Sequence, residues 1–295
     1  MLRILPGLDY SLVHPTFTLG PFVASSFSAM NVLAILLGAG LGAWQAERAG
    51  VDWRDAVDIA LWAGIAGLIG AKVFTLVRFP HELANFSIAK FRSTRLVWYG
   101  GLIGGAAVGV WRARRLRLPV SGTLDQGACA VAAGHAVGRV GCFLAGDDYG
   151  FSTTLPWGIL LPRGAPPSTA GYLRAHGERI LASIPDSQIM AVHPAMLYEA
   201  IGNIAIAAYL WRRSHGAYRP WSNIALYSVS YGALRFCIEF VRVKDDRLPT
   251  GITIAQIVSV GMMAVGAVLL AWTRRARSET IQQQLAAMPR GALAT

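Results

Sequence analysis

Long apolar stretches recur along the chain and are separated by short polar segments that carry most of its charged residues. A helix that crosses a lipid bilayer needs about 20 mostly apolar residues. We assign such spans to residues 22–45, 57–78, 96–111, 121–143, 194–211, 222–241 and 251–273. The third and fourth spans are rich in glycine, so their limits are less sharply defined. The pattern predicts an all-α, polytopic membrane helix bundle with about seven transmembrane helices.

Two polar segments lie outside these spans. Residues 145–192 form the longest of them and contain Pro156, Pro162, Pro166, Pro167 and Pro185. We expect this segment to form a small extramembrane head. Residues 278–295 are polar and are expected to form a cytoplasmic tail, either an interfacial or a loose helix. The chain is therefore divided into one transmembrane domain over residues 1–277 and this tail.

Clusters of arginine indicate the orientation of the spans, because short cytoplasmic loops are enriched in Lys and Arg. The clusters are Arg112, Arg114, Arg115 and Arg117, then Arg212, Arg213 and Arg219, then Arg274, Arg275 and Arg277. With seven spans, all three clusters fall on one side of the membrane. We therefore expect the N-terminus and the 145–192 head to face outward and the C-terminus to be cytoplasmic.

The composition supports a membrane protein and argues against several other classes. Charged residues make up only 15% of the chain, whereas a soluble domain carries about 25%. This argues against a cytosolic enzyme, a disordered protein and a nucleic-acid binder, since the net charge of +11 is confined to short clusters between apolar runs. The three cysteines lie in apolar segments and imply no disulfide framework. No secretory signal peptide is evident, so we expect insertion through an uncleaved first span.

Ionisable residues inside the predicted spans are costly to bury, and each is a candidate for function. Lys72 has an ordinary explanation, since its ammonium can reach the head groups, and His135 can be a satisfied core histidine. Arg139 differs, because it lies in the glycine-rich segment from Gly138 to Gly150. A guanidinium in such a setting can bind a phosphate through two hydrogen bonds. The alternative is that Arg139 pairs with Asp125 or Glu239 only to hold helices together.

A second polar cluster lies on the sixth predicted span. Tyr231, Arg235 and Glu239 are spaced at i, i+4 and i+8, so they share one face of a helix. A polar stripe on an apolar span must face the bundle interior or a wet cavity. Two interior arginines with few acids would form an anion site, and phospholipid head groups are the obvious anions at this depth.

A histidine precedes the fifth predicted span. Pro194 suits the first turn of that helix, which leaves His193 as a cap at the outer surface. A histidine with a pKa near 6.5 can act as a general base. The alternative is a capping histidine that takes no part in chemistry.

Taken together, the motifs resemble prolipoprotein diacylglyceryl transferase, a bacterial family of membrane enzymes. Tyr99 to Gly104 is similar to the family's His-Gly-Gly-Leu motif, and Gly138 to Gly150 to its signature, usually Gly-Arg-x-Gly-Asn-Phe-x-Asn-Gly-Glu. His193 to Glu199 resembles its His-Pro-x-Gln-Leu-Tyr-Glu motif, and Arg235 to Arg242 its Arg-Phe-x-x-Glu-Phe-x-Arg motif. The likeness runs in order along nearly the whole chain, and the ordered set is specific.

The resemblance implies a reaction and its partners. The family transfers the diacylglyceryl group of phosphatidylglycerol to the cysteine thiol of a prelipoprotein lipobox, with release of glycerol phosphate and without a metal or a cofactor. Carried over to this chain, Arg139 and Arg235 bind the phosphate and stabilise the transition state, and Glu239 orients Arg235. Supporting substrate-binding positions are Asp125, Gly150, Tyr231, Asp147, Gly100 and Gly101. The bacterial inner membrane is the implied location.

The chain also departs from the family pattern. Tyr99 stands where the family has the histidine proposed as thiol-activating base, Cys142 replaces the signature asparagine and Asp147 its glutamate. A tyrosine with a pKa near 10 is a poor base at neutral pH unless a nearby cation lowers that value. Three interpretations remain: another residue such as His193 is the base, the electropositive site activates the thiol, or the chain is a divergent paralogue with other acceptor chemistry.

An alternative from another class is a lipid-binding or transport membrane protein with an arginine anion site. Buried arginines and glycine-broken spans also occur in transporters, whose sites often lie between inverted repeats. We find no convincing internal repeat in the sequence. A transferase releases glycerol phosphate only when a thiol acceptor is present, whereas a transporter releases none.

Overall fold

The computed structural model describes residues 13–19, 22–78, 98–216, 218–243 and 251–287. Seven helices form a bundle, namely α1 (Ser26–Arg48), α2 (Trp53–Arg78), α4 (Trp98–Arg115), α5 (Val120–Ala145), α7 (Ala195–Ser214), α8 (Ser222–Ile238) and α9 (Ile254–Ala287). An antiparallel hairpin of β1 (Thr16–Leu19) and β2 (Phe22–Ser25) precedes α1. The segment between α5 and α7 contains β3 (Ile159–Leu160), α6 (Ala170–Ala175) and β4 (Ala191–Val192).

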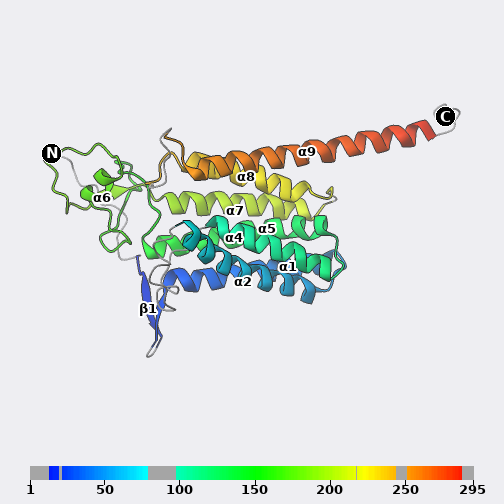
Figure 1. The fold of residues 1–295 in the computed structure, drawn as a ribbon, viewed down its shortest axis with the longest axis horizontal. Helices are drawn as coiled ribbons and strands as arrows, with labels where there is room; N and C mark the ends of the chain where they lie inside the picture. The colour runs from blue at the N-terminus through cyan, green and yellow to red at the C-terminus, as the bar shows by residue number, and fades with distance from the viewer. Residues whose placement is uncertain (1–12, 20–21, 79–97, 217, 244–250, 288–295) are drawn as a thin grey trace.

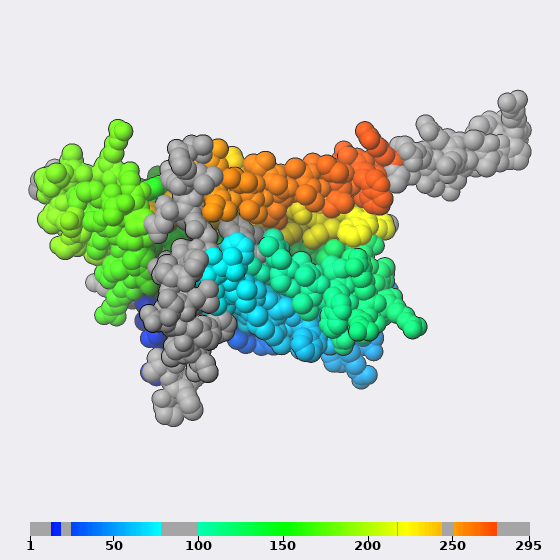
Figure 2. Space-filling model, viewed as in Figure 1, coloured from blue at the N-terminus to red at the C-terminus, as the bar shows by residue number. Residues whose placement is uncertain are grey.

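The bundle helices run side by side in alternating directions, and the other elements gather at one end of the bundle (Figure 1). The β1–β2 hairpin and the α6 segment lie at that end, whereas α9 extends past the opposite end. The head is a compact body against the helix ends (Figure 2). It contains a two-stranded antiparallel sheet, in which Ile159 pairs with Val192 and Leu160 with Ala191. Leu161, Leu173 and Val192 form its fully buried core.

The helical fold agrees with the sequence prediction, and the structure adjusts several boundaries. Residues 22–25, predicted to open the first span, form β2, and α1 begins after Ser25. The sixth helix ends at Ile238 rather than at residue 241. The last helix continues to Ala287, so part of the predicted tail extends α9. Residues 96 and 97 of the predicted third span lie outside the described residues.

Four helices in the described part of the chain are long and apolar enough to cross a membrane, namely α1, α2, α5 and α9. Many large apolar side chains on the outside of the bundle are exposed, including Val77 and Val268. A soluble surface rarely carries so much continuous apolar area. The bundle is therefore that of a membrane protein. The sequence predicts seven spans, which include α4, α7 and α8 in addition to these four helices.

Helices α2 and α4 pack at very short distance through glycine. The backbones of Gly70 and Gly100 approach so closely that a Cβ atom on either would clash with the carbonyl oxygen of the other. One turn further, a Cβ atom on Gly104 would lie 2.6 Å from the carbonyl oxygen of Ala66. Membrane helices associate through such small residues because apolar burial gives no driving force between helices in lipid. The glycines of the third predicted span therefore serve helix packing.

Candidate active site

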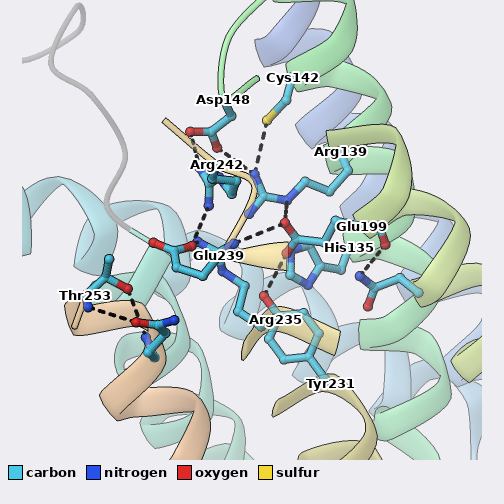
Figure 3. A network of polar contacts seen from close by, with 12 residues as sticks. His135, Arg139, Cys142, Asp148, Glu199, Tyr231, Arg235, Glu239, Arg242 and Thr253 are labelled. Atoms are coloured by element: carbon cyan, nitrogen blue, oxygen red, sulfur yellow. Dashed lines mark hydrogen bonds and ion pairs between the residues drawn. The ribbon is translucent and has the colours of Figure 1, made fainter. Parts of the chain in front are cut away.

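Three arginines and three carboxylates alternate in a closed ring (Figure 3). Asp148, Glu239 and Arg242 of the ring directly follow the ends of α5 and α8. Arg139 pairs with Asp148 through Nη1 at 2.7 Å and with Glu199 through Nε at 3.0 Å. Arg235 pairs with Glu239 at 2.8 Å and approaches Glu199 at 3.7 Å. Arg242 closes the ring, since it pairs with Asp148 and lies 3.7 Å from Glu239.

The ring is almost completely buried. Glu199 and Glu239 are each 1% exposed and Arg242 is 2% exposed, whereas the side chain of Asp148 is 34% exposed. Removing one ion from such a set would leave an uncompensated buried charge, which costs about 3–5 kcal/mol. The six charged groups therefore depend on one another, and any ligand of the site meets preorganised guanidinium groups.

Glu199 joins the ring to the core of the bundle. Its Oε1 accepts a hydrogen bond from the Tyr231 hydroxyl at 3.0 Å and lies 3.4 Å from Nε2 of His135. Its Oε2 faces the two arginines of α5 and α8. Residues from α5, α7 and α8 thus meet at one carboxylate, which fixes the relative positions of Arg139 and Arg235.

Local structure explains why these residues meet. Arg235 and Glu239 are one helical turn apart at the end of α8, so their side chains lie on the same face. The chain after α5 then pairs with the chain after α8, because Phe151 N donates to Val241 O at 2.9 Å and Val243 N donates to Tyr149 O at 3.3 Å. This short ladder includes an antiparallel bridge between Gly150 and Arg242. It places Asp148 beside Arg242.

The ring is suited to binding a phosphate. Guanidinium groups in a buried setting donate paired, charge-assisted hydrogen bonds to phosphate oxygens. Nε of Arg242 is buried and has no hydrogen-bond partner among the described residues. Donors directed at a site where negative charge develops stabilise a transition state without reorganisation. The arrangement can therefore bind a phosphoester and stabilise it as a leaving group.

An apolar groove of about 420 Å³ lies on the side of α5 that also faces α1 and α7. Its lining residues include Met30, Leu33, Val137, Val140 and Ile204, and Leu33 and Ile204 are exposed on the outside of the bundle. Val140 follows Arg139 directly in α5. The groove thus runs along the outer surface of the helix that supplies Arg139, and it is lined almost entirely by hydrocarbon.

Asp147 and Cys142 lie beside the ring. Nη1 of Arg139 is 3.6 Å from Cys142 Sγ. Burial and the neighbouring charge of Asp148 raise the pKa of Asp147 to about 7. Ligand atoms of Cys142, Asp147 and Asp148 lie within 4.8 Å of one another, as in a small metal site. A cation there would compete with Arg139, which donates to both Cys142 and Asp148, so the donor set does not favour a metal.

His193 lies outside the ring, in a pocket between the head and the ends of α7 and α8. Trp157, Tyr198, Cys237, Ile238 and Val241 line the pocket with His193, and its volume is about 420 Å³. The His193 ring contacts the Tyr198 hydroxyl through Nδ1 at 3.1 Å, and Trp157 donates to the same hydroxyl at 2.8 Å. Burial lowers the pKa of His193, against an opposing effect of Glu178, and favours the neutral imidazole.

The predicted capping role of His193 is not what the structure shows. Pro194 occupies the N-cap position of α7, and no side chain caps the helix there. The His193 side chain instead turns to Tyr198, one turn into α7. His193 therefore does not cap α7, and its side chain lines the pocket.

Asp125 is not brought to the ring. Its Oδ1 accepts hydrogen bonds from Asn223 N and Ile224 N, both at 2.9 Å. These amides lie in the first turn of α8, whose N-cap residue Trp221 makes no side-chain capping hydrogen bond. Asp125 thus caps the start of α8, at the opposite end of that helix from Arg235. Arg139 pairs with neither Asp125 nor Glu239 but with Asp148 and Glu199.

The glycines predicted to bind substrate lie where the backbones of neighbouring segments pack closely. Gly100 and Gly101 face α2, where Gly101 would place a Cβ atom 3.4 Å from the carbonyl oxygen of Gly67. Gly150 lies where a Cβ atom would meet His193 Cβ at 2.8 Å and overlap the carbonyl oxygen of Val241. It therefore permits the crossing that joins the head to α7 and α8. Tyr99 is in the first turn of α4, and its side chain lies outside the described residues.

The shared face of Tyr231, Arg235 and Glu239 is confirmed. Arg235 and Glu239 belong to the ring, and the Tyr231 hydroxyl donates a hydrogen bond to Glu199 of the ring. Sequence reasoning did not assign Arg242 or Asp148 to the site, and it gave no role to Glu199, which as an ionisable residue near the end of a predicted span was a general candidate for function. Glu199 and Arg242 end two of the quoted motifs, and Arg242 follows Arg235 by two helical turns, which was an available signal. Asp148 has no such signal, because its role depends on the ladder that forms only in the fold.

Comparison with known proteins gives a consistent result. The profile of the family described as prolipoprotein diacylglyceryl transferase matches residues 15–272. A protein of Xanthomonas euvesicatoria pv. vesicatoria (strain 85-10), named phosphatidylglycerol–prolipoprotein diacylglyceryl transferase, is 31% identical over 88% of this chain and 90% of its own length. A protein of the same name from Vibrio cholerae serotype O1 (strain ATCC 39541 / Classical Ogawa 395 / O395) is 26% identical over 90% of this chain and 93% of its own.

Proposed function

The chain belongs to the prolipoprotein diacylglyceryl transferase family, and we propose that it transfers the diacylglyceryl group of phosphatidylglycerol to the cysteine thiol of a prelipoprotein lipobox. In this reaction the thiol sulfur attacks the glyceryl carbon that carries the phosphate ester. A carbon–sulfur bond forms, the carbon–oxygen bond breaks, and glycerol phosphate leaves with the electron pair. The thiol proton passes to a base.

The closed ring of buried arginines is the observation that carries this proposal. The leaving group gains negative charge as its ester bond breaks, and Arg139, Arg235 and Arg242 surround the position where that charge develops. Glu239 orients Arg235, and Glu199 orients Arg139. Tyr231 supports this arrangement through its hydrogen bond to Glu199. The acyl chains of the lipid lie in the apolar groove beside Arg139.

We assign the thiol base to His193 rather than to Tyr99. The lowered pKa of His193 keeps its imidazole neutral and able to accept a proton at neutral pH. Its pocket is lined by Ile238 and Val241, which flank Glu239 of the ring in the sequence. The lipobox cysteine enters this pocket, which brings its sulfur between base and lipid.

The protein acts in the bacterial inner membrane, with the seven bundle helices as seven spans. Arginine clusters end α4 and α7, and a third lies in α9. The ends of α4 and α7 and the extension of α9 lie at the end of the bundle away from the head (Figure 1). This distribution supports a cytoplasmic location for that end and an outward-facing head and ring. The reaction then takes place on the side of the membrane where a translocated signal peptide emerges.

An acceptor-dependence assay tests the proposed function. The purified full-length chain in detergent is incubated with phosphatidylglycerol, with and without a lipobox-cysteine peptide, and released glycerol phosphate is measured. We expect release only with the peptide, and loss of release in the Arg139→Ala variant. Lipid binding without release, in protein that melts normally, would contradict the transferase proposal and favour the lipid-binding or transport alternative.

A further inference from the structure

The three carboxylates of the ring are not equivalent. Glu199 and Glu239 lie at the core of the bundle and are 1% exposed, whereas the Asp148 side chain is 34% exposed. Asp148 lies just after α5 and has a φ of +59°, a conformation that costs energy for most residues but little for Asp and Asn. It is the carboxylate of the ring that solvent and an incoming ligand can reach.

The charge balance of the ring leaves no excess positive charge for a ligand. Three guanidinium groups face three carboxylates, and every carboxylate bridges two arginines. A phosphodiester carries one negative charge. Buried anions are stable only when paired, so a phosphodiester can bind in the ring only if one carboxylate gives up its arginines.

The backbone around Asp148 can stay in place while its side chain moves. The flanking residues are held by Phe151 N donating to Val241 O and by Val243 N donating to Tyr149 O. Displacement of the carboxylate therefore needs a rotation of one short side chain toward solvent, and no change of fold. Glu199 has no comparable freedom, because it also contacts Tyr231 and His135 in the core.

We propose that Asp148 is a displaceable internal anion, and that a lipid phosphate binds by replacing its carboxylate on Arg139 and Arg242. The identity of the lipid as phosphatidylglycerol rests on the proposed function. With Asp148 withdrawn, the remaining ring carries one excess positive charge, which matches the single charge of a phosphodiester. After the reaction, the returning carboxylate competes with glycerol phosphate for the same donors and promotes its release.

This competition lowers the apparent affinity for the lipid. If Asp148 holds the arginines about nine-tenths of the time, the apparent dissociation constant is about tenfold larger than the intrinsic one. The Asp148→Asn variant removes the charge while keeping the shape, and asparagine tolerates the positive φ. We therefore expect this variant to bind the lipid phosphate about tenfold more tightly.

Equilibrium binding of a short-chain phosphatidylglycerol to the purified full-length chain tests the proposal, with no acceptor peptide present. Asp148→Glu, which keeps a carboxylate, is expected to bind like the wild type or more weakly. The matched control is Asp186→Asn, which makes the same charge change at an exposed aspartate of the head that pairs with Arg174. We expect this control to leave the dissociation constant unchanged. In the transfer assay, Asp148→Asn should lower the KM for the lipid and slow product release.

The outcomes separate the two proposals. Unchanged or weaker binding by Asp148→Asn, in a variant that melts like the wild type, would overturn the displacement and make Asp148 a positioning residue. If Asp148→Asn melts early, the comparison of Asp148→Glu with the wild type decides, and tighter binding by that variant would overturn the proposal. A third outcome is that the wild type binds the lipid, Asp148→Asn binds it more tightly, and no transfer occurs. This outcome would support the displacement of Asp148 and contradict only the proposed transfer reaction. Absence of lipid binding by the wild type would overturn both.

Discussion

Single residues of the ring act through their partners rather than alone. Glu199 illustrates this, because one buried carboxylate faces Arg139, Arg235, Tyr231 and His135 together. The desolvation of a carboxylate and of two guanidinium groups is offset only by these contacts. A phosphate that takes the place of the Asp148 carboxylate would therefore meet arginines that Glu199 and Glu239 already hold in position, which is the condition for strong electrostatic catalysis.

The identity of the thiol base is tested by two substitutions. His193→Gln should lower kcat by about 100-fold or more, the usual contribution of a positioned general base. Tyr99→Phe should keep near-normal activity. Burial lowers the pKa of His193, so the imidazole becomes protonated only at a pH below the usual histidine range. We therefore expect activity to persist as the pH is lowered through that range and to fall only below it. The opposite pattern, with loss in Tyr99→Phe and not in His193→Gln, would assign the base to Tyr99.

Asp147 gives the protein a pH-dependent stability. Its pKa is raised to about 7 in the folded protein, against about 3.9 in an unfolded chain. Its ionisation is therefore disfavoured by folding, and stability falls as the pH rises between these two values. Asp147→Asn removes this loss, so the variant should melt above the wild type at about pH 8 and close to it below about pH 4. Melting followed by tryptophan fluorescence checks this, and equal melting at both pH values would contradict it.

At the scale of helices, the glycines of α2 and α4 determine how closely two elements approach. The carbonyl oxygen of Gly70 and the Cβ atom of Phe74 occupy the space that a methyl group on Gly100 would need. The neighbouring Gly101 has its nearest such contact at 3.4 Å. The two adjacent glycines thus differ sharply in the room around them.

Alanine at each position tests this difference. Gly100→Ala should destabilise the protein by about 1–3 kcal/mol, since overpacking forces the backbones apart. Gly101→Ala is the matched control and should be close to neutral, because alanine is also favoured over glycine in a helix by about 1 kcal/mol. Melting temperatures in detergent measure both. Equal tolerance of the two substitutions would show that α2 and α4 are not packed as described.

The sequence predicted the helices far better than the contacts between them. Long apolar runs indicate where the helices lie, so each predicted span corresponds to one bundle helix of the described residues, within a few residues at most ends, although α9 continues to Ala287, well beyond the predicted end at residue 273. Helix periodicity also placed Tyr231, Arg235 and Glu239 on one face. It could not place Asp125, because the amides that this carboxylate caps are almost 100 residues away in the sequence. Nor could it reveal that the ladder after α5 and α8 brings Asp148 to Arg242.

At the scale of the whole molecule, the fold separates two ends of the bundle. One end carries the head and the hairpin, and α9 extends past the other (Figure 1). The ring includes Asp148 and Glu239, which follow the ends of α5 and α8 beside the head, whereas arginine clusters end α4 and α7. The seven described bundle helices alternate in direction, so β1 and the end of α9 lie at opposite ends, as the ribbon shows. If the bundle crosses the membrane as proposed, the ring lies near one membrane surface and the arginine clusters near the other.

Cysteine labelling of intact cells tests this orientation. Cys237 is exposed and is first replaced by serine, while Cys129 and Cys142 are buried. In this background Leu181→Cys, at a head residue that is 71% exposed, should react with a membrane-impermeant thiol reagent. Arg115→Cys and Arg275→Cys should react only after the membrane is permeabilised. Labelling of Arg115→Cys in intact cells would contradict the proposed topology.

The mass of the acceptor peptide after reaction is the most direct test of the central claim, that this arginine ring performs a diacylglyceryl transfer to a cysteine thiol. The peptide is incubated with phosphatidylglycerol and the purified chain, beside a matched peptide in which serine replaces the lipobox cysteine. We predict that the cysteine peptide gains the mass of one diacylglyceryl group, while the serine peptide stays unchanged and Arg139→Ala gives no product. An unmodified cysteine peptide, with folded protein that still binds the lipid, would contradict the account.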